Sequence, residues 1–260
     1  MARRRTVAEE RSFGGLLAPG VPRPVWKTSE VVAFAVARDI VEHGLHSGDR
    51  LPLEAEMVEH YRVSRESLRE ALRLLEAQGI VSIRRGPGGG PVVGTASSMN
   101  LARTMTLYFQ LAGATYEELL EAWRMLEPLG AELAAKNRDR QLVERTLRAH
   151  LEHFDDGGDL TAYQTHSNGL HFSVIDLAEN QVLALVVGAI GDIIRTHVIL
   201  RIDPFELRQL IDEDHAAVAE AVIAGEAERA RAAMLAHIDG LAPIYRSHWD
   251  GDVEEIIEWK

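Results

Sequence analysis

The chain has 260 residues and a formal net charge of −12, which suits one large or two modest domains and, taken over the whole chain, argues against nucleic acid as a partner. Hydrophobic residues make up 46% and charged residues 26%, so a disordered or fibrous chain is excluded, and the longest nearly apolar run, Val182–Ile190, has about half the length of a membrane-spanning helix. The chain has no cysteine, which excludes disulfides, thiolate catalysis and zinc sites built on cysteine.

The first 24 residues are predicted to form a flexible arm. They are rich in glycine and proline and show neither a helical nor a strand period. The basic start Met1–Arg5 has no apolar segment behind it, so we expect no secretory signal. Together with the absence of cysteine, this favours a cytoplasmic protein without membrane contact.

Residues 25–95 are predicted to form a winged helix-turn-helix domain. A helical period starts at Thr28 or Ser29 and ends near Gly44, a short helix follows over 54–61, and a third helix starts after its cap Ser64 and ends at Gly79. Two short strand-like runs over 80–84 and 91–93 flank a glycine-rich tip, which is typical of a hairpin. Three helices and a hairpin within about 65 residues give the outline of this domain.

After a linker over 96–100, residues 101–250 are predicted to form an all-α antiparallel helical bundle. Their period is helical throughout, and breaks such as Gly113, Asn137 and Gly225 separate the helices. The expected helices cover about 100–112, 115–136, 139–155, 159–178, 180–200, 204–224 and 226–246. The fold class is therefore mainly α, with a winged helix followed by a helical bundle.

The overall charge conceals a difference between these two parts. Residues 1–95 contain 14 basic and 12 acidic side chains, a net charge of +2, so the remainder carries −14. Within the first part, Arg65, Arg69 and Arg73 follow at i, i+4 and i+8 on one face of the third helix, while Leu68 and Leu72 lie on another. Charge alone fits either a surface that binds nucleic acid or a solvated helix face with balancing glutamates.

The arrangement has the chemistry of a major-groove reader. A row of guanidinium groups matches phosphates and the O6/N7 edge of guanine. Ser64 and Ser67 lie at the start of the helix, where hydroxyl and amide groups can donate to phosphates. Arg84 and Arg85, beside the glycine-rich tip, extend the basic surface along the hairpin.

Several motifs at fixed spacing resemble the DNA-binding domain of the GntR family of bacterial transcriptional regulators. They are Gly48-Asp49-Arg50-Leu51-Pro52-Leu53-Glu54, Val63-Ser64-Arg65-Glu66-Ser67-Leu68-Arg69-Glu70-Ala71-Leu72, Gly79-Ile80-Val81 and Gly86-Pro87-Gly88-Gly89-Gly90. The resemblance covers about residues 28–94. It implies that Ser64, Arg65, Ser67 and Arg69 contact DNA from the recognition helix and that Arg85 and Gly86 do so from the wing. Ala55 departs from the family, where a polar or basic residue is common.

Three of the 11 histidines lie on apolar helix faces of the second part. His171 shares a face with Val174 and Ile175, His215 with Val218 and Val222, and His237 with Met234 and Leu241. Each ring is therefore expected to point into the bundle, where three imidazoles suit a divalent metal such as Zn²⁺, Ni²⁺ or Mn²⁺. A single inward histidine is more often a hydrogen-bonded core residue.

The same region resembles the FCD ligand-binding domain of the FadR branch of the GntR family. The motifs are Leu170-His171 with Asn180, Glu213-Asp214-His215, Met234 to His237, and Arg124-Met125-Leu126-Glu127, within about residues 101–246. In metal-binding members the matching histidines and an aspartate one turn before the first hold the ion, and the effector's carboxylate completes the site. Ser167 stands at the aspartate position here, and Asn168 offers a carbonyl oxygen instead. A metal site and a histidine-lined anion pocket both remain open.

Arginines of the bundle are candidate partners for an acidic ligand. Arg124 shares a helix face with Leu120 and Ala131, so it either projects into the pocket and clamps a carboxylate or pairs with Glu121 or Glu127 on its own helix. Arg195 and Arg201 are weaker candidates of the same kind.

We therefore expect a regulator without enzymatic activity. The resemblance implies a homodimer that binds a short inverted repeat in double-stranded DNA, most often a repressor that is released by a small acidic metabolite, either an organic acid or a fatty acyl-CoA. One alternative is a metal-dependent enzyme that uses His171, His215 and His237, but no His-Glu-x-x-His motif or obvious general base accompanies them. A purely architectural DNA-binding protein is another alternative, which leaves the acidic bundle without a role.

Overall fold

The computed structural model describes residues 26–86, 88–152, 154, 157–199, 207–248 and 254–259. The predicted arm, Arg201 and the first residues of the helix predicted over 204–224 lie outside the described residues. The chain divides into two compact units, one up to Thr95 and one from Ala96 onwards. Each unit is built around its own hydrophobic core.

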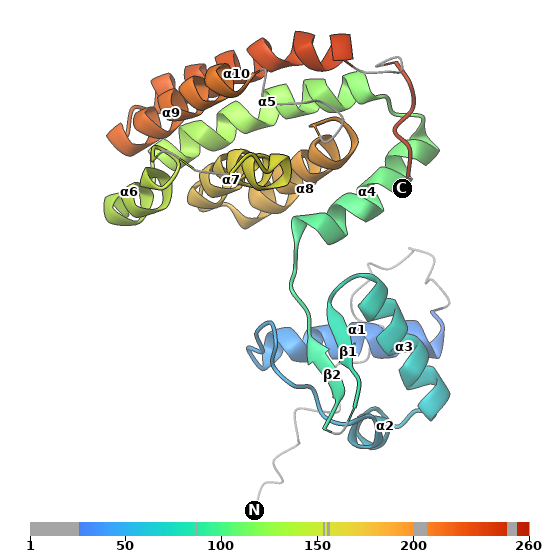
Figure 1. Cartoon of the computed structure of the whole chain (residues 1–260). Coiled ribbons are helices and arrows are strands. Elements are labelled where there is room, and N and C mark those ends of the chain that lie inside the picture. Colours follow the sequence, from blue (N-terminus) through green and yellow to red (C-terminus); the bar gives the residue numbers. More distant parts are fainter. Residues whose placement is uncertain are drawn as a thin grey trace, which may run out of the picture. The chain divides into compact units, whose positions relative to one another are not determined.

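The first unit is a winged helix-turn-helix, as predicted (Figure 1). Its elements are α1 (Thr28–Glu42), α2 (Glu54–Tyr61), α3 (Arg65–Ala77), β1 (Val81–Arg84) and β2 (Gly90–Val93). The two strands pair antiparallel, from Val81 opposite Val93 to Arg84 opposite Gly90. Backbone bonds of 2.8 Å from Val93 N to Asp49 O and 3.0 Å from Leu51 N to Pro91 O attach the segment before α2 to the free edge of β2.

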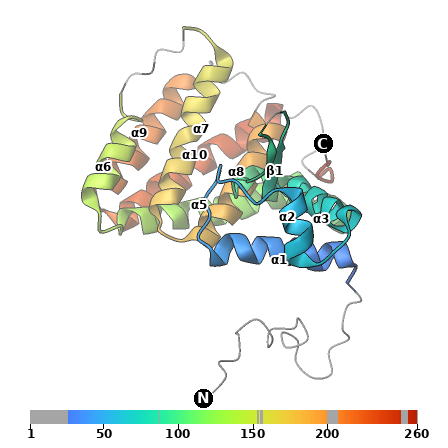
Figure 2. The ribbon, with the colours of Figure 1, turned by 90° about the horizontal axis from the view of Figure 1, so that it is seen from below.

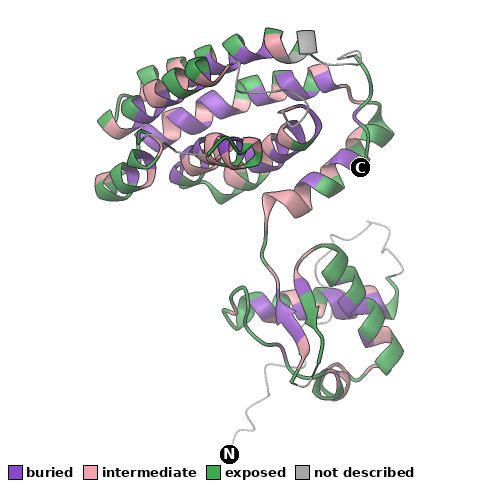
Figure 3. Cartoon of the chain, viewed as in Figure 1, coloured by how far each residue is buried: buried purple, intermediate pink, exposed green. Residues whose placement is uncertain are grey.

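The apolar stripe of α3 fixes the orientation of this helix. Its predicted members Leu68, Ala71, Leu72 and Leu75 are all buried, in one cluster with residues of α1, α2 and the hairpin. Burying an aliphatic side chain of this size contributes about 1.5–3 kcal/mol, so the stripe determines which face of α3 meets the core. The opposite face, with its arginines, is exposed (Figure 3).

The second unit is the expected bundle of helices. Within the described residues it contains α4 (Ser98–Ala112), α5 (Tyr116–Ala135), α6 (Arg140–Arg148), α7 (Leu160–Leu177), α8 (Gln181–His197), α9 (Arg208–Ala224) and α10 (Ala227–His248). Side chains that accept bonds from the first-turn amides start α5 (Thr115), α7 (Asp159) and α8 (Asn180), and Gly225 ends α9 in the left-handed conformation with φ 76°.

Helix α5 lies at the centre of this bundle. It packs against α7 and α8 on one side and against α9 and α10 on the other (Figure 1). Many of the residues of α5 are buried (Figure 3). Figure 2 shows α6, α9 and α7 as neighbours, and all three pairs are in contact. Positions on α5, α7, α9 and α10 therefore share one interior.

Helix α6 is shorter than the helix that the period predicted over 139–155. It ends at Arg148, and His150 N and Leu151 N then form turn bonds to Leu147 O and Arg148 O. The His150 ring instead contacts α7, with its Nε2 3.1 Å from Ser173 Oγ. A tertiary contact thus replaces the helical continuation that local sequence favours.

The described C-terminal residues return to the bundle, beyond the predicted boundary at 250. Ile256 bridges to Thr115 across the backbone, Ile257 N donates to Ala114 O at 2.9 Å, and the Ile257 side chain is fully buried. None of the described helices combines the length and apolar character that crossing a membrane requires.

Candidate functional site

The first candidate surface is the N-terminal part of α3. Ser64 caps the helix, its Oγ accepting from Ser67 N at 3.1 Å and lying 2.9 Å from Ser67 Oγ. Arg65 and Arg69 are exposed on the face opposite the buried stripe. The helix start therefore presents amides, hydroxyls and guanidinium groups on one surface, which is the set of donors that phosphates and base edges accept.

Arg69 has a protein partner that the sequence did not reveal. Its Nε donates to Glu54 Oε2 at 2.9 Å, from α3 to the start of α2. Both side chains remain partly exposed, so the pair contributes little to stability, at most about 1 kcal/mol. Its effect is to hold the guanidinium in one direction along the surface of α3.

The wing carries the other two predicted contacts. Arg85 and Gly86 follow β1 and are exposed, and Gly86 has a φ of 100°, which side-chain-bearing residues rarely adopt. Gly86 therefore permits a tight tip at which backbone can approach a groove. Arg85 also lines a surface hollow with Arg69 and Arg73, together with the carboxylates of Glu54 and Glu76, so the wing and α3 contribute to one charged surface.

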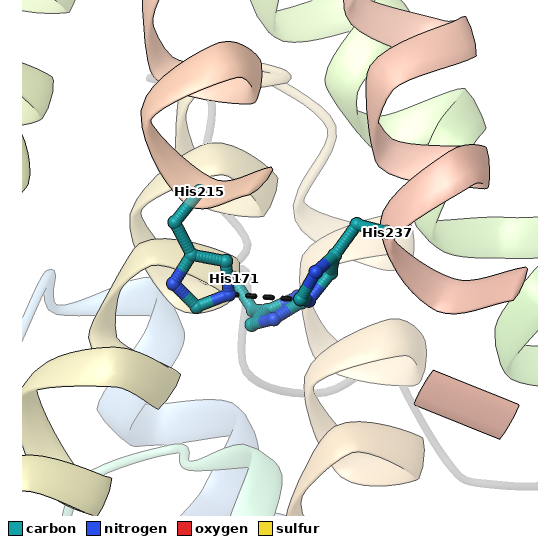
Figure 4. Close-up of side chains that lie close together, drawn as sticks. All are labelled: His171, His215 and His237. Atoms are coloured by element: carbon teal, nitrogen blue, oxygen red, sulfur yellow. Dashed lines mark hydrogen bonds between the residues drawn. The ribbon is translucent and has the colours of Figure 1, made fainter. Parts of the chain in front are cut away.

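The second candidate site is a cluster of three imidazoles inside the bundle. His171 comes from α7, His215 from α9 and His237 from α10, and one nitrogen of each lies within 4.8 Å of the others. Figure 4 shows the three rings converging on one point. His215 and His237 are buried and His171 is nearly so. The structure thus brings together the three side chains that the apolar faces predicted to be inward.

The hydrogen bonds of His237 determine which of its two ring nitrogens carries the lone pair. Its Nδ1–H donates to Asp214 Oδ2 at 3.3 Å, which leaves the Nε2 lone pair to accept from Nε2–H of His215 at 3.1 Å. A carboxylate at the outer nitrogen is the usual partner of a metal-binding histidine, because it holds the ring and makes the inner nitrogen more basic.

His171 has a corresponding carboxylate, Glu127 of α5. Glu127 Oε2 lies 3.3 Å from His171 Nδ1, although the two groups are not aligned as a hydrogen bond. Its Oε1 accepts from Trp123 Nε1 at 3.0 Å, and the side chain is only 3% exposed. Glu127 is a residue of this site that the sequence did not single out, although its place in the motif Arg124-Met125-Leu126-Glu127 was the available signal.

Burial and neighbouring charge act on these groups in opposite directions. Burial would raise the pKa of Glu127, but His171 and the Trp123 hydrogen bond outweigh it and hold that pKa below its usual value. Burial lowers the pKa of His215 well below 6.5, and it lowers the pKa of His237 despite the opposing effect of Asp214. Glu127 is therefore ionised and both buried histidines are neutral near pH 7, as metal ligation requires.

The donor set fits a divalent transition metal. Zinc binds imidazole nitrogen at about 2.0–2.1 Å, so ligand nitrogens in a tetrahedral site lie roughly 3.4 Å apart. The separations here are 3.1 Å between His215 and His237 and at most 4.8 Å over the set. Three imidazoles with carboxylates behind two of them suit Zn²⁺, Ni²⁺ or Mn²⁺, and His171, His215 and His237 would hold the ion.

A small cavity adjoins the cluster, and we call it the histidine cavity. It is lined by residues that include Trp123, Glu127, Asn168, His171 and Gly191, and its volume is about 20 Å³. That space suits an ion or a single water. Asn168 donates its side-chain N–H to Gln164 O at 2.7 Å, which leaves its amide oxygen as the acceptor for this cavity.

The predicted arginine clamps are not at this cavity. Arg124 forms a two-pronged ion pair with Asp239 of α10, on the exposed side of α5, with Nη2 2.9 Å from Asp239 Oδ2. Arg124 therefore lies away from the histidine cavity and pairs with neither Glu121 nor Glu127. Arg195 lies 3.6 Å from Asp192 one turn earlier, also away from the histidine cavity. Arg201 lies outside the described residues.

Comparison with family models matches both units. The model described as "Bacterial regulatory proteins, gntR family" matches residues 28–89, and the FCD domain model matches residues 118–240. The LutR transcriptional regulator of Bacillus subtilis is 25% identical over 215 residues, covering 81% of this chain and 97% of that protein. A putative L-lactate dehydrogenase operon regulatory protein of Escherichia coli is 30% identical over 224 residues, covering 82% and 84%.

A solved structure supports the fold. A GntR protein of Streptococcus agalactiae has a TM-score of 0.60 at 23% identity, covering 83% of this chain and 99% of its own. The winged helix, the bundle and both family matches agree. The chain belongs to the GntR family of DNA-binding transcriptional regulators and carries a C-terminal FCD ligand-binding domain.

Proposed function

We propose that this chain is a metal-dependent repressor of the FadR branch that is released from its operator by a small carboxylate. The observation that carries the proposal is the convergence of His171, His215 and His237, with Glu127 and Asp214 behind two of them. A divalent ion held there supplies positive charge that attracts a carboxylate. The arrangement provides a reason for an acidic effector in a domain whose net charge is strongly negative.

The DNA-binding half of the proposal depends on the surface of α3 and the wing. Ser64, Arg65, Ser67 and Arg69 would contact one half-site from α3, and Arg85 and Gly86 would contact it from the wing. A single short helix covers few base pairs, so a homodimer on an inverted repeat supplies the second half-site. Such a dimer acts where the chromosome is, in the cytoplasm.

A small carboxylate is favoured over a fatty acyl-CoA as the effector. The relatives include a putative L-lactate dehydrogenase operon regulatory protein, whose name connects it with a hydroxycarboxylate. We infer that the effector shifts the dimer between two arrangements of its DNA-binding units. The free energy of this shift is no larger than the difference between the effector's binding free energies for the two arrangements.

The test is a binding assay with the full chain loaded with zinc. Fluorescence anisotropy with DNA from upstream of its own gene measures affinity with and without L-lactate, D-gluconate and hexanoyl-CoA. We expect nanomolar binding that a small carboxylate weakens at least about tenfold and that a chelator also changes. A DNA affinity that neither the ligands nor the chelator changes would instead support an architectural role.

A further inference from the structure

Arg62 occupies the turn between α2 and α3 in an unusual backbone conformation. It ends α2 in the left-handed region, with φ 53° and ψ 47°. In the described part of the chain, Glu179 is the one other residue with a side chain that has a positive φ. The left-handed region brings the Cβ of an L-residue close to the following carbonyl oxygen, so glycine or asparagine is the usual residue there. An arginine at this position therefore lowers the stability of the domain.

The residues on either side of Arg62 fix this conformation. Tyr61 and Val63 both pack against the core of the first unit. Tyr61 Oη also donates to Asp39 Oδ2 of α1 at 2.8 Å, and Val63 N donates to Val58 O at 3.3 Å. Arg62 is exposed between these two anchored neighbours. The fold thus imposes the strain, and the choice of arginine needs a separate reason, because strained residues gather at functional sites.

The guanidinium group of Arg62 has no carboxylate partner within the described part of the chain, although other arginines of this unit do. Arg38 lies 3.4 Å from Asp39, and Arg69 lies 2.9 Å from Glu54. An exposed guanidinium without such a partner offers its five N–H donors to an external acceptor. A cation after α2 also interacts favourably with the negative end of the helix dipole, which is the structural alternative to a ligand.

The turn that carries Arg62 joins the two helices of the helix-turn-helix, which are labelled α2 and α3 in Figure 1. In this motif the first helix crosses the DNA backbone and the N-terminus of the second enters the major groove. The turn between them therefore runs along the wall of the groove, where the phosphates are. Arg62 precedes the cap Ser64 by two residues, so their Cα atoms are at most about 7.6 Å apart.

We propose that Arg62 contacts a DNA phosphate at the wall of the major groove, beside the half-site that α3 reads. The proposal rests on the DNA-binding part of the proposed function and extends it to a residue outside both α3 and the wing. A guanidinium group matches the oxygens of a phosphate in a two-pronged arrangement. A phosphate contact positions the protein without reading a base, so Arg62 contributes affinity for every DNA sequence.

The test measures DNA affinity and stability on the zinc-loaded full chain. Fluorescence anisotropy uses a duplex from upstream of its own gene and a scrambled duplex, at several salt concentrations. We expect Arg62→Gly to weaken binding to both duplexes at least about tenfold and to reduce the slope of log affinity against log salt by about 0.9 per bound protomer. Its thermal unfolding midpoint stays at or above the wild-type value, because glycine tolerates the left-handed region. Arg62→Lys keeps the charge and most of the affinity.

Two further variants separate the loss of a cation from the relief of strain. Glu179→Gly replaces a residue of the second unit that has the same φ of 53°, and it removes no cation, so DNA affinity should stay as in the wild type. Arg38→Ala removes an exposed cation from α1, and it should bind both duplexes as the wild type does.

Three results would overturn the proposal. If Arg62→Gly keeps wild-type affinity and salt dependence while Arg65→Ala loses affinity, Arg62 does not contact DNA, and the proposed function still stands. If only binding to the upstream duplex is weakened, Arg62 contacts a base instead of a phosphate. If the unfolding midpoint of Arg62→Gly falls, the arginine stabilises the end of α2, and its effect on DNA is indirect. Failure of every carboxylate to change DNA affinity would instead reject the effector part of the proposed function and leave the assignment of Arg62 intact.

Discussion

Glu127 and His171 face each other across 3.3 Å in the interior of the helical unit, on two helices that pack side by side. Glu127 does not take the place of an aspartate one turn before His171, where Ser167 stands, because its carboxylate lies beside the His171 ring. Its oxygen approaches Nδ1, so Nε2 of His171 is the nitrogen left for the cluster. Glu127 therefore acts as a positioning residue behind a ligand.

Replacing the Glu127 carboxylate should weaken metal binding without abolishing it. We expect Glu127→Gln to lower Zn²⁺ affinity about 10- to 100-fold, because loss of an outer carboxylate leaves the ring less basic and less firmly held. Competition with a chelating dye measures this. Glu132→Gln is the matched control, since Glu132 lies on the same helix but bonds to Lys136 and Arg231. Equal affinities for Glu127→Gln and wild type would remove Glu127 from the site.

Removing one imidazole should have a larger effect. We expect His215→Ala to lose stoichiometric metal and to alter the response to the effector, because two histidines are too few for a firm site. Elemental analysis of the purified protein measures the metal content, and His46→Ala, which removes an exposed imidazole in the first unit, should retain it. His215→Asn serves if the alanine variant folds poorly. Equal metal in mutant and wild type would reject the assignment.

Arginines on the exposed face of α3 should determine DNA affinity. Arg65→Ala and Arg69→Ala are each expected to cost about 1–3 kcal/mol of operator binding while the thermal unfolding midpoint stays the same, because both side chains lie outside the core. Anisotropy at several salt concentrations also reports phosphate contacts as a reduced salt dependence. Arg38→Ala on α1 is the control and should bind normally. Unchanged affinity in both α3 variants would mean that another surface binds DNA.

Without added metal, stability should fall as the pH decreases from neutral. Burial holds the pKa of His215 well below its usual 6.5 and lowers that of His237, so the unfolded state binds more protons below about pH 6.5. The contribution of these two neutral histidines to the free energy of unfolding is fully present above that pH. It is lost progressively below it, by at most about 1.4 kcal/mol per pH unit for each histidine. Glu127, whose pKa is lowered from 4.5, affects the free energy of unfolding only below about pH 4.5.

Urea unfolding in the presence of a chelator, from pH 8 to pH 5, measures this dependence. His215→Asn cannot take up a proton at this position and should show a shallower decline than the wild type. An unfolding free energy that is the same at pH 7.5 and pH 5.5 in the wild type would show that the two histidines are not buried in neutral form.

Local sequence was sufficient to predict the helices and strands and to predict which helix faces are buried and which are exposed. Leu68, Leu72 and Leu75 recur at helical spacing, so α3 and its exposed arginines follow from the period, and Ser64 marks the start of the helix. The same reasoning predicted His215 and His237 to be buried. The period of a helix depends on neighbouring residues only, which is why these features needed no tertiary information.

Only the tertiary structure decided which residues lie opposite one another. A helical period assigns a side chain to a face, but the neighbour across that face comes from a distant part of the chain. Arg124 meets Asp239, 115 positions away, and not a glutamate of its own helix. Glu127 reaches His171, and the contact of His150 with Ser173 follows an α6 shorter than its period suggested. The sequence determined that three histidines point inward; the packing of α5, α7, α9 and α10 decided that they meet and which carboxylates stand behind them, because contacts between helices depend on how whole helices pack.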